Sequence, residues 1–238
     1  MKKTYALPLA LALAVPLAHA GRPLATDDAG TAAPQTCQLE AWYEHSGSEL
    51  STVLAPACGV AEGLELDLGV TLPAQRRELL LGGGLAFKWV PAAWASSTPL
   101  GDLAFGFKGG VDYEHPAGSG WRQAGIGGLL LVSLQINEQW AVHLNPGRGQ
   151  WRPMGQPQFQ ASLLNVAATW APGDQGLLFA EWQGNSRRAD LGSPTVSAGG
   201  RWWLQKDKLG LDLTVGRETA SGVPTQVTLG FGWYGLGY

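Results

Sequence analysis

A histidine and a serine are the residues of this sequence whose types best suit covalent chemistry. His143 and Ser162 fall on neighbouring predicted strands, as the histidine and serine of an outer-membrane lipid hydrolase would. Strand parity, however, places both side chains inside rather than at the membrane boundary. The sequence contains no G-x-S-x-G elbow, no H-E-x-x-H motif, no C-x-x-C motif and no phosphate-binding loop. We therefore expect no enzyme, and keep a lipid hydrolase that uses His143 and Ser162 as a less favoured alternative.

The two cysteines, Cys37 and Cys58, bracket the first predicted hairpin. A turn between Gly47 and Ser48 places Cys37 directly opposite Cys58, close enough for a disulfide. In the chain-entropy model this bond would constrain the unfolded chain by about 3 kcal/mol. The alternative is two free thiols, but an exported protein favours the disulfide. Two cysteines are too few for a four-ligand zinc site, and we expect neither a metal nor a cofactor.

Ten ionisable side chains alternate with apolar residues and are predicted to line an interior. They are Glu40, Glu65, Asp67, Lys88, Lys108, Asp112, His143, Glu181, Arg201 and Asp212. Inward charges must pair or meet water, because desolvating one alone costs several kcal/mol. A dense ion-pair network would plug the lumen, whereas a wet lumen would pass small solutes. We favour a narrow polar pathway slightly, and the excess of acids predicts a mild preference for cations.

The elements that position these side chains are strands, because the apolar residues recur with a period of two. Over residues 64–72, leucine or valine fills every even position, and the same alternation recurs over 103–113 and 209–215. Leu129 and Leu131 depart from the pattern, because their parity points them inward. Twelve strands are predicted, over residues 36–45, 49–58, 63–72, 79–90, 102–114, 122–135, 139–146, 159–171, 176–184, 194–205, 208–217 and 224–234.

The number and length of these strands indicate a membrane barrel. An even count of strands, most of about 9–11 residues, is typical of bacterial barrels, and strands can span lipid only as a closed sheet. The inner connections are mostly short, whereas the outer connections include long ones at residues 115–121, 146–158 and 185–193. Aromatic residues gather near both ends of the strands, as they do at the two membrane interfaces. The predicted fold is all-β, a closed antiparallel up-and-down transmembrane β-barrel of about 12 strands over residues 36–238, preferred to a soluble sandwich or lipocalin-like barrel.

Composition excludes several other classes of protein. The chain has 238 residues, of which 45% are apolar and 15% charged, and it contains 34 glycines. The low charge and the many glycines argue against a helical bundle, and the apolar fraction argues against disorder. Lys plus Arg number 16 against 19 for Asp plus Glu, so we expect no nucleic acid partner.

The first twenty residues are predicted to be a signal peptide. Lys2 and Lys3 precede a short apolar run over residues 7–17, and residues 18–20 offer the small side chains that a signal peptidase reads. The run is too short for a membrane anchor, which needs about 20 apolar residues. We expect export, cleavage after Ala20 and residence in a bacterial outer membrane.

The two ends of the mature chain carry further expectations. Residues 21–35 are predicted to be a periplasmic segment in which Asp27 and Asp28 are solvated; the alternative is that they enter the barrel mouth and pair with Lys88 or Arg201. A change of parity near residues 233–235 requires a bulge. The terminal Tyr238 partly matches the motif that the barrel-assembly machinery recognises in outer-membrane proteins.

Outer-membrane lipids and lipopolysaccharide are the other expected partners. A guanidinium matches the geometry of phosphate, so arginines on the outer loops would contact lipopolysaccharide, although they would equally serve to solvate the loops. The predicted outer-loop arginines are Arg76, Arg77, Arg148, Arg152, Arg187, Arg188 and Arg217.

Four short motifs occur in a characteristic order. They are TDDAG at residues 26–30, CQLEAWYE at 37–44, GVAEGLELDLG at 59–69 and LGDLAFGFK at 100–108. This order resembles the outer-membrane transporters of the phenol-degradation (MetA-pathway) type over roughly residues 24–110. The resemblance implies a barrel that moves hydrophobic or aromatic compounds, and it brings no catalytic residues.

The sequence as a whole predicts a passive narrow pore or transporter-like barrel for small solutes. The alternative is a structural or surface-binding barrel with a plugged lumen. The identity of the solute does not follow from the residues.

Overall fold

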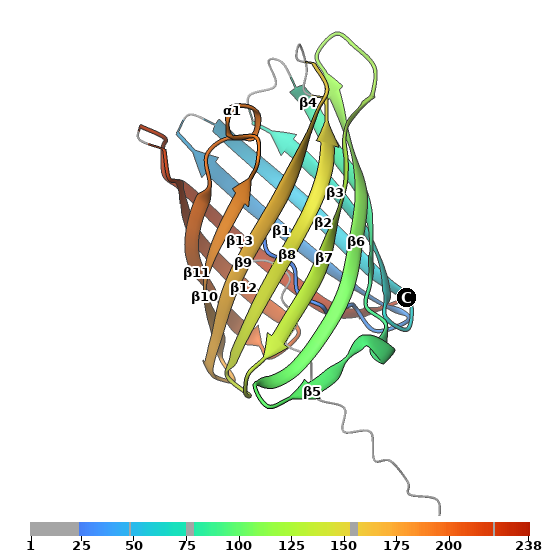
Figure 1. Cartoon of the computed structure of the whole chain (residues 1–238). Helices are drawn as coiled ribbons and strands as arrows, with labels where there is room; N and C mark the ends of the chain where they lie inside the picture. The colour runs from blue at the N-terminus through green and yellow to red at the C-terminus, as the bar shows by residue number, and fades with distance from the viewer. Residues whose placement is uncertain (1–23, 48, 75–78, 153–156, 221) are drawn as a thin grey trace, which may run out of the picture.

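The protein consists almost entirely of antiparallel strands (Figure 1). The structure, a computed structural model, describes residues 24–47, 49–74, 79–152, 157–220 and 222–238. In chain order its elements are β1 (Thr36–Ser46), β2 (Glu49–Ala61), β3 (Leu64–Pro73), β4 (Leu79–Trp89), η1 (Ala92–Trp94), β5 (Ser96–Thr98), β6 (Gly101–Pro116), β7 (Arg122–Gln135), β8 (Trp140–Trp151), β9 (Phe159–Gly173), β10 (Gly176–Asn185), α1 (Arg188–Leu191), β11 (Thr195–Gln205), β12 (Leu209–Glu218) and β13 (Gln226–Gly237).

The sheet closes on itself. β1 pairs with β13 and β4 pairs with β6, so that twelve strands form a ring. The short β5 pairs with β6 and lies outside the ring, within the predicted connection at residues 91–101. Closure gives hydrogen-bond partners to the backbone groups that a free sheet edge would expose. The predicted closed antiparallel barrel of twelve strands is confirmed.

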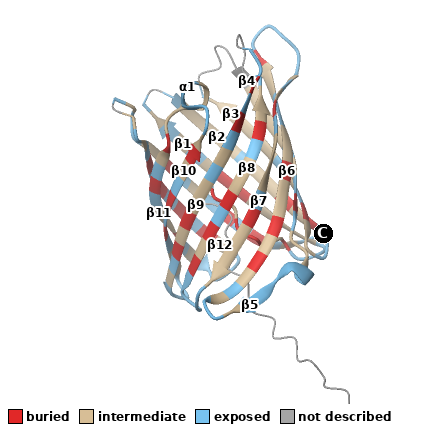
Figure 2. Ribbon diagram, viewed as in Figure 1, coloured by how far each residue is buried: buried red, intermediate tan, exposed pale blue. Residues whose placement is uncertain are grey.

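The two faces of the wall differ as the period of two requires. On β12, Leu211 and Leu213 are each 48% exposed, whereas Asp212 between them is 6% exposed. The alternation of buried and exposed residues recurs along the strands (Figure 2). A water-soluble barrel would place its large apolar residues inside, so this wall has the opposite arrangement.

The two ends of the barrel differ in their connections (Figure 1). We call the end that holds Thr36 and Gly237 the turn end, because β2–β3, β7–β8, β9–β10 and β11–β12 connect there through two to four residues. The opposite end, the loop end, carries longer connections such as 117–121 and 186–194. The predicted loop at 146–158 is shorter than expected, because β8 continues to Trp151.

Residues 24–35, which we call the inner segment, run inside the ring of strands (Figure 1). The inner segment contacts side chains of β3, β4, β6, β7, β8 and β10, and these strands surround it. Thr26 and Asp28 are only 1% and 3% exposed. The expectation of a solvated segment is therefore wrong, because the barrel interior offers this segment polar partners that a loose terminus lacks.

Two small apolar clusters hold the inner segment against the wall. Leu24 packs on Ala167 and Phe179, and Ala29 packs on Ala104 and Leu131. The second cluster explains why Leu131 departs from the outward apolar pattern. Its side chain faces inward because the inner segment covers it, and it is 0% exposed.

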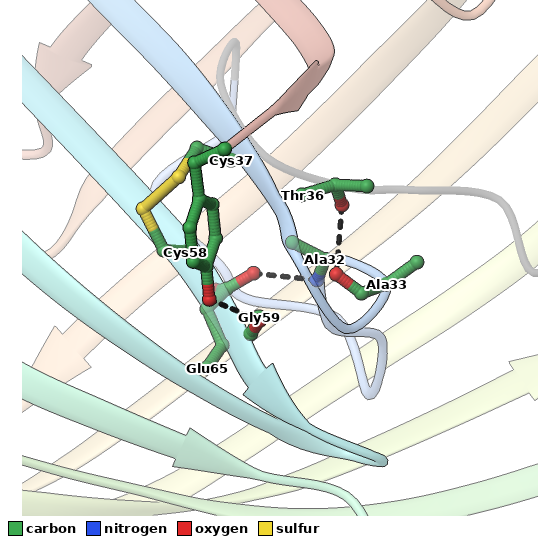
Figure 3. The surroundings of a disulfide bond; sticks show 8 residues. Ala32, Ala33, Thr36, Cys37, Cys58, Gly59 and Glu65 are labelled. Carbon is green, nitrogen blue, oxygen red and sulfur yellow. Dashed lines mark hydrogen bonds between the residues drawn. A yellow bond between two sulfur atoms is a disulfide. The ribbon is translucent and has the colours of Figure 1, made fainter.

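The turn end contains the two local features expected near it. The register of β1 with β13 shifts by one residue between Cys37 and Leu39, and Gly235 has a positive φ of 68°, so the predicted bulge is confirmed. Cys37 faces Cys58 across β1 and β2 and forms the predicted disulfide, with Cα atoms 4.0 Å apart (Figure 3). In the described residues, no helix is long and apolar enough to cross a membrane.

Candidate functional site

An ion network in the middle of the lumen holds the inner segment. The Asp27 carboxylate lies 2.6 Å from Lys88 Nζ on β4 and 2.6 Å from Lys108 Nζ on β6. Lys108 also pairs with Asp67 on β3 at 3.1 Å, and Lys88 lies 3.4 Å from Asp28. We call these five residues the central network. Through them, one carboxylate of the inner segment joins two strands of the wall.

Side chains of the wall also accept hydrogen bonds from backbone N–H groups of the inner segment. Glu181 on β10 accepts from the N–H and hydroxyl of Thr26, each at 2.9 Å. Glu65 on β3 accepts from the N–H of Ala32 at 2.6 Å (Figure 3). Residues 24–33 pair with no strand and need such partners, because an unpaired buried N–H costs as much as a lost hydrogen bond. The inner carboxylates therefore replace a sheet ladder for this segment.

Two neutral residues continue this pattern on β7 and β8. Asn145 accepts from the Asp27 N–H at 2.7 Å and donates to the Asp27 carbonyl at 3.0 Å. Ser133 Oγ accepts from the Ala29 N–H at 2.8 Å and lies 2.9 Å from His143 Nδ1. The segment is thus fixed in register by specific bonds along its length.

The electrostatic environment of Asp27 favours its ionised form. Burial alone would raise the pKa of this carboxyl group, but the ammonium groups of Lys108 and Lys88 outweigh burial and hold the pKa well below its usual range. Asp27 therefore carries its charge wherever the inner segment is docked.

A second charged cluster lies within the wall, toward the turn end. Arg201 on β11 makes two hydrogen bonds to Asp212 on β12, Nε to Oδ1 and Nη2 to Oδ2, both at 2.7 Å. Its Nη2 lies 3.6 Å from Glu40 on β1, and its guanidinium lies over the rings of Trp203 and Tyr234. Tyr234 donates to Glu40 at 2.6 Å. We call these five residues the Arg201 cluster.

A cavity of about 440 Å³ extends from the central network toward the loop end. Residues 24–27 and Lys108 form its floor, and Asp112, Trp42 and Trp151 are among the residues of its walls. Asp112 lies four residues from the loop end of β6, and Trp151 ends β8 at that same end. The cavity, which we call the vestibule, is therefore lined by charged and aromatic side chains beside the inner segment and reaches toward the loop end.

The ten residues predicted to line the interior fall into three groups in the structure. Asp67, Lys88 and Lys108 belong to the central network, and Glu40, Arg201 and Asp212 to the Arg201 cluster. The other four lie at separate positions. Glu65 and Glu181 accept hydrogen bonds from backbone N–H groups of the inner segment. His143 contacts Ser133, and Asp112 lines the vestibule.

Several residues of the site were not among the predicted ones. Asn145 and Ser133 are inward-facing residues of β8 and β7, so strand parity identifies them, although neither side chain is ionisable. Trp151 lies beyond the predicted strand 139–146, so only the longer β8 of the structure places it in the wall. The alternative that Asp27 enters the barrel holds for Lys88 but not for Arg201. Asp27 pairs with Lys88 and Lys108, and Arg201 pairs with residues of the wall instead.

The pairing of His143 with Ser162 is wrong. In the register of β8 with β9, His143 faces Ala167, whereas Ser162 faces Arg148. Ser162 is exposed and has the outward parity of Leu164, while His143 is 2% exposed and points inward. The error lies in the parity assigned to β9. These two residues cannot act together, and in the described residues no group of three or more His, Cys, Asp or Glu could hold a metal ion.

The predicted outer-loop arginines are placed differently from one another. Arg148 lies within β8, where its guanidinium donates to Gln160 at 2.7 Å, so its placement in a loop is wrong. Arg187 pairs with Asp190 at 2.8 Å and lies over the ring of Phe159. Three others lie at the loop end, Arg152 after β8, Arg188 in α1 and Arg217 in β12. Arg76 and Arg77 lie outside the described residues.

Comparison with known proteins gives a family and a fold. The model of the family described as "Uncharacterised conserved protein UCP029691" matches residues 9–232. This match does not confirm the resemblance of the four motifs to the phenol-degradation transporters. No curated protein matches the chain.

Three solved structures share the barrel fold at low sequence identity. The "KdgM porin" aligns with a TM-score of 0.57 at 12% identity, over 82% of this chain and 98% of that chain. The "KdgM porin in complex with disordered oligogalacturonate" gives 0.60 at 12% identity over 82% and 98%. A "NanC porin structure in rhombohedral crystal form" gives 0.59 at 6% identity over 83% and 98%.

Proposed function

The chain belongs to the family described as Uncharacterised conserved protein UCP029691, and we propose that it is a passive channel for small solutes in a bacterial outer membrane. The observation that carries this proposal is the vestibule of about 440 Å³ in a lumen lined by charged side chains. A barrel with only a structural role has no need of a cavity lined by ions, because each inward charge costs desolvation energy. The inner segment then narrows the pathway at the central network.

The outer surface supports a membrane location. Its exposed leucines and aromatic residues, such as Leu85, Leu130 and Leu229, are 55–56% exposed, which a lipid environment would cover. The proposal includes export by a signal peptide cleaved after Ala20, contact of loop-end arginines with lipopolysaccharide, and recognition of Tyr238 by the assembly machinery. In the folded barrel, the Tyr238 hydroxyl donates to the Gly59 carbonyl at 3.2 Å.

The class of solute follows from charge and from the motif resemblance. The inward acidic side chains outnumber the basic ones, so the lumen disfavours an acidic sugar such as the oligogalacturonate named for one KdgM structure. The resemblance to phenol-degradation transporters supports small hydrophobic or aromatic compounds. We therefore include small neutral or cationic aromatic compounds among the solutes.

Planar-bilayer recording of the mature protein, residues 21–238, tests the channel. We expect small conductance steps in potassium chloride, and larger steps from a variant that lacks residues 24–33. Absence of conductance from both proteins would overturn the channel and leave a barrel with a plugged lumen. Heat-modifiable mobility on a gel serves as the control that each protein has closed its barrel.

A further inference from the structure

We propose that the vestibule contains a binding site for a small organic cation, formed by the carboxylate of Asp112 and the indole ring of Trp151. The site deepens the proposed channel function, on which its role in transport rests, because it names a solute class for the same lumen. It stands on the placement of these two side chains and on the cavity that both line.

Asp112 is a carboxylate without a partner in the described part of the chain. It has neither a hydrogen bond nor an ion pair there, although it is exposed and lines the cavity. The nearest cations along the same strands are already engaged. Lys108 pairs with Asp27 and Asp67, and Arg122 pairs with Glu114. An external cation is therefore the counterion that this carboxylate lacks.

Glycines on the neighbouring strands hold Asp112 and Trp151 side by side. A Cβ atom at Gly125 would come within 3.1 Å of Asp112 Oδ2 and 3.2 Å of Trp151 Cδ1. A Cβ atom at Gly149 would lie 2.3 Å from the Trp151 ring, so this glycine leaves the space into which the indole folds. The bare backbone at these positions brings the carboxylate and the ring to one patch of wall.

The pair has the chemistry that recognises an ammonium group on an apolar body. A carboxylate supplies charge, and the face of an indole ring attracts a cation. Trp151 is half-buried, so part of its ring stays open. The adjoining ring of Phe159, 6.0 Å away, already carries a cation on its face, because the Arg187 guanidinium lies 5.5 Å from its centroid.

Isothermal titration calorimetry of the mature protein in detergent tests the site, with benzyltrimethylammonium as the probe. We expect saturable binding of this cation and none of benzoate. Asp112→Asn should weaken binding about tenfold, in line with the value of a charge-assisted contact. Trp151→Leu should weaken it about fivefold, with Trp151→Phe retaining most of the affinity. The matched control is Asp174→Asn, which removes an exposed charge at the turn end, outside the cavity, and should change affinity less than about twofold.

Two results would overturn the site: equal affinity of Asp112→Asn and wild type, or binding of benzoate as tight as that of the cation. Calorimetry does not require conduction, so the two proposals fail separately. Cation binding without conductance would retain the site and refute the channel. Conductance without cation binding would retain the channel and refute the site.

Discussion

The lumen contains two clusters that both pair buried cations with carboxylates but are built differently. The Arg201 cluster joins β1, β11, β12 and β13, and its central pair is set by register, because Arg201 and Asp212 are direct cross-strand partners. The central network joins β3, β4 and β6 to Asp27, which belongs to no strand. One cluster connects wall to wall, and the other connects the wall to a segment laid inside it.

Because of this difference, the Arg201 cluster contributes to the folding of the barrel, and the central network contributes to the docking of the inner segment. The pair of Arg201 and Asp212 forms whenever β11 and β12 pair, so its free energy belongs to the folding of the barrel. The contacts of Asp27 form only when the inner segment docks, so their free energy belongs to docking, a local transition that can occur in a folded barrel. Changes to one cluster should therefore leave the other process almost unaffected.

The largest expected effect is on barrel stability, from Arg201→Met. The change leaves the buried carboxylate of Asp212 without its two hydrogen bonds, and removing one partner of a buried pair costs about 3–5 kcal/mol. Urea unfolding in lipid vesicles, followed by tryptophan fluorescence, measures the loss. Hydrogen exchange of residues 24–33 should remain as slow as in the wild type.

Arg187→Met is the matched control for that substitution. Arg187 is exposed and pairs with Asp190 at the surface, so its loss should change the free energy of unfolding by less than about 1 kcal/mol. If Arg201→Met instead accelerated exchange in the inner segment while leaving unfolding unchanged, the assignment of the Arg201 cluster to the wall would be refuted.

An intermediate effect is expected from acid, acting on the central network. The pKa of Asp27 in the docked segment lies below the ordinary value of about 3.9. A group whose pKa is lowered by docking stabilises the docked state above its ordinary pKa, and this contribution is lost as the pH falls toward the lowered value. Conductance should therefore change little above about pH 4 and rise as the pH is lowered further, because the segment then leaves the lumen.

The variant Asp27→Asn isolates this carboxyl from the other acids of the lumen. It should conduct at pH 7 much as the wild type does in acid, and its conductance should depend only weakly on pH over the same range. A steep pH dependence that persists in Asp27→Asn would assign the transition to another carboxylate.

The two regions also differ in how well the sequence predicts them. Strand parity placed Arg201, Asp212 and Glu40 inward, and Cys37 opposite Cys58, because a period of two and a short hairpin fix faces and register locally. No periodicity describes residues 24–35, and their partners lie on strands as distant in sequence as β10. Leu129 and Leu131 held the missing information, because two inward leucines in a polar lumen need an apolar contact, and Ala29 provides it for Leu131.

The smallest expected effect comes from Ser133→Ala, which tests whether single hydrogen bonds hold the inner segment. The change removes the acceptor of the Ala29 N–H and the partner of His143 Nδ1, while the barrel keeps its closure and its other contacts. A neutral hydrogen bond contributes about 1 kcal/mol, so hydrogen exchange of residues 24–33 should quicken about fivefold, and urea unfolding should shift little. Thr169→Ala is the matched control, because it removes an inward hydroxyl whose one hydrogen bond among the described residues goes to the Ala141 carbonyl of the wall, at 3.5 Å. Equal exchange rates in wild type and Ser133→Ala would contradict this prediction. They would mean that the ion pairs of the central network stabilise the docked segment and that the Ser133 hydrogen bond adds no measurable free energy to docking.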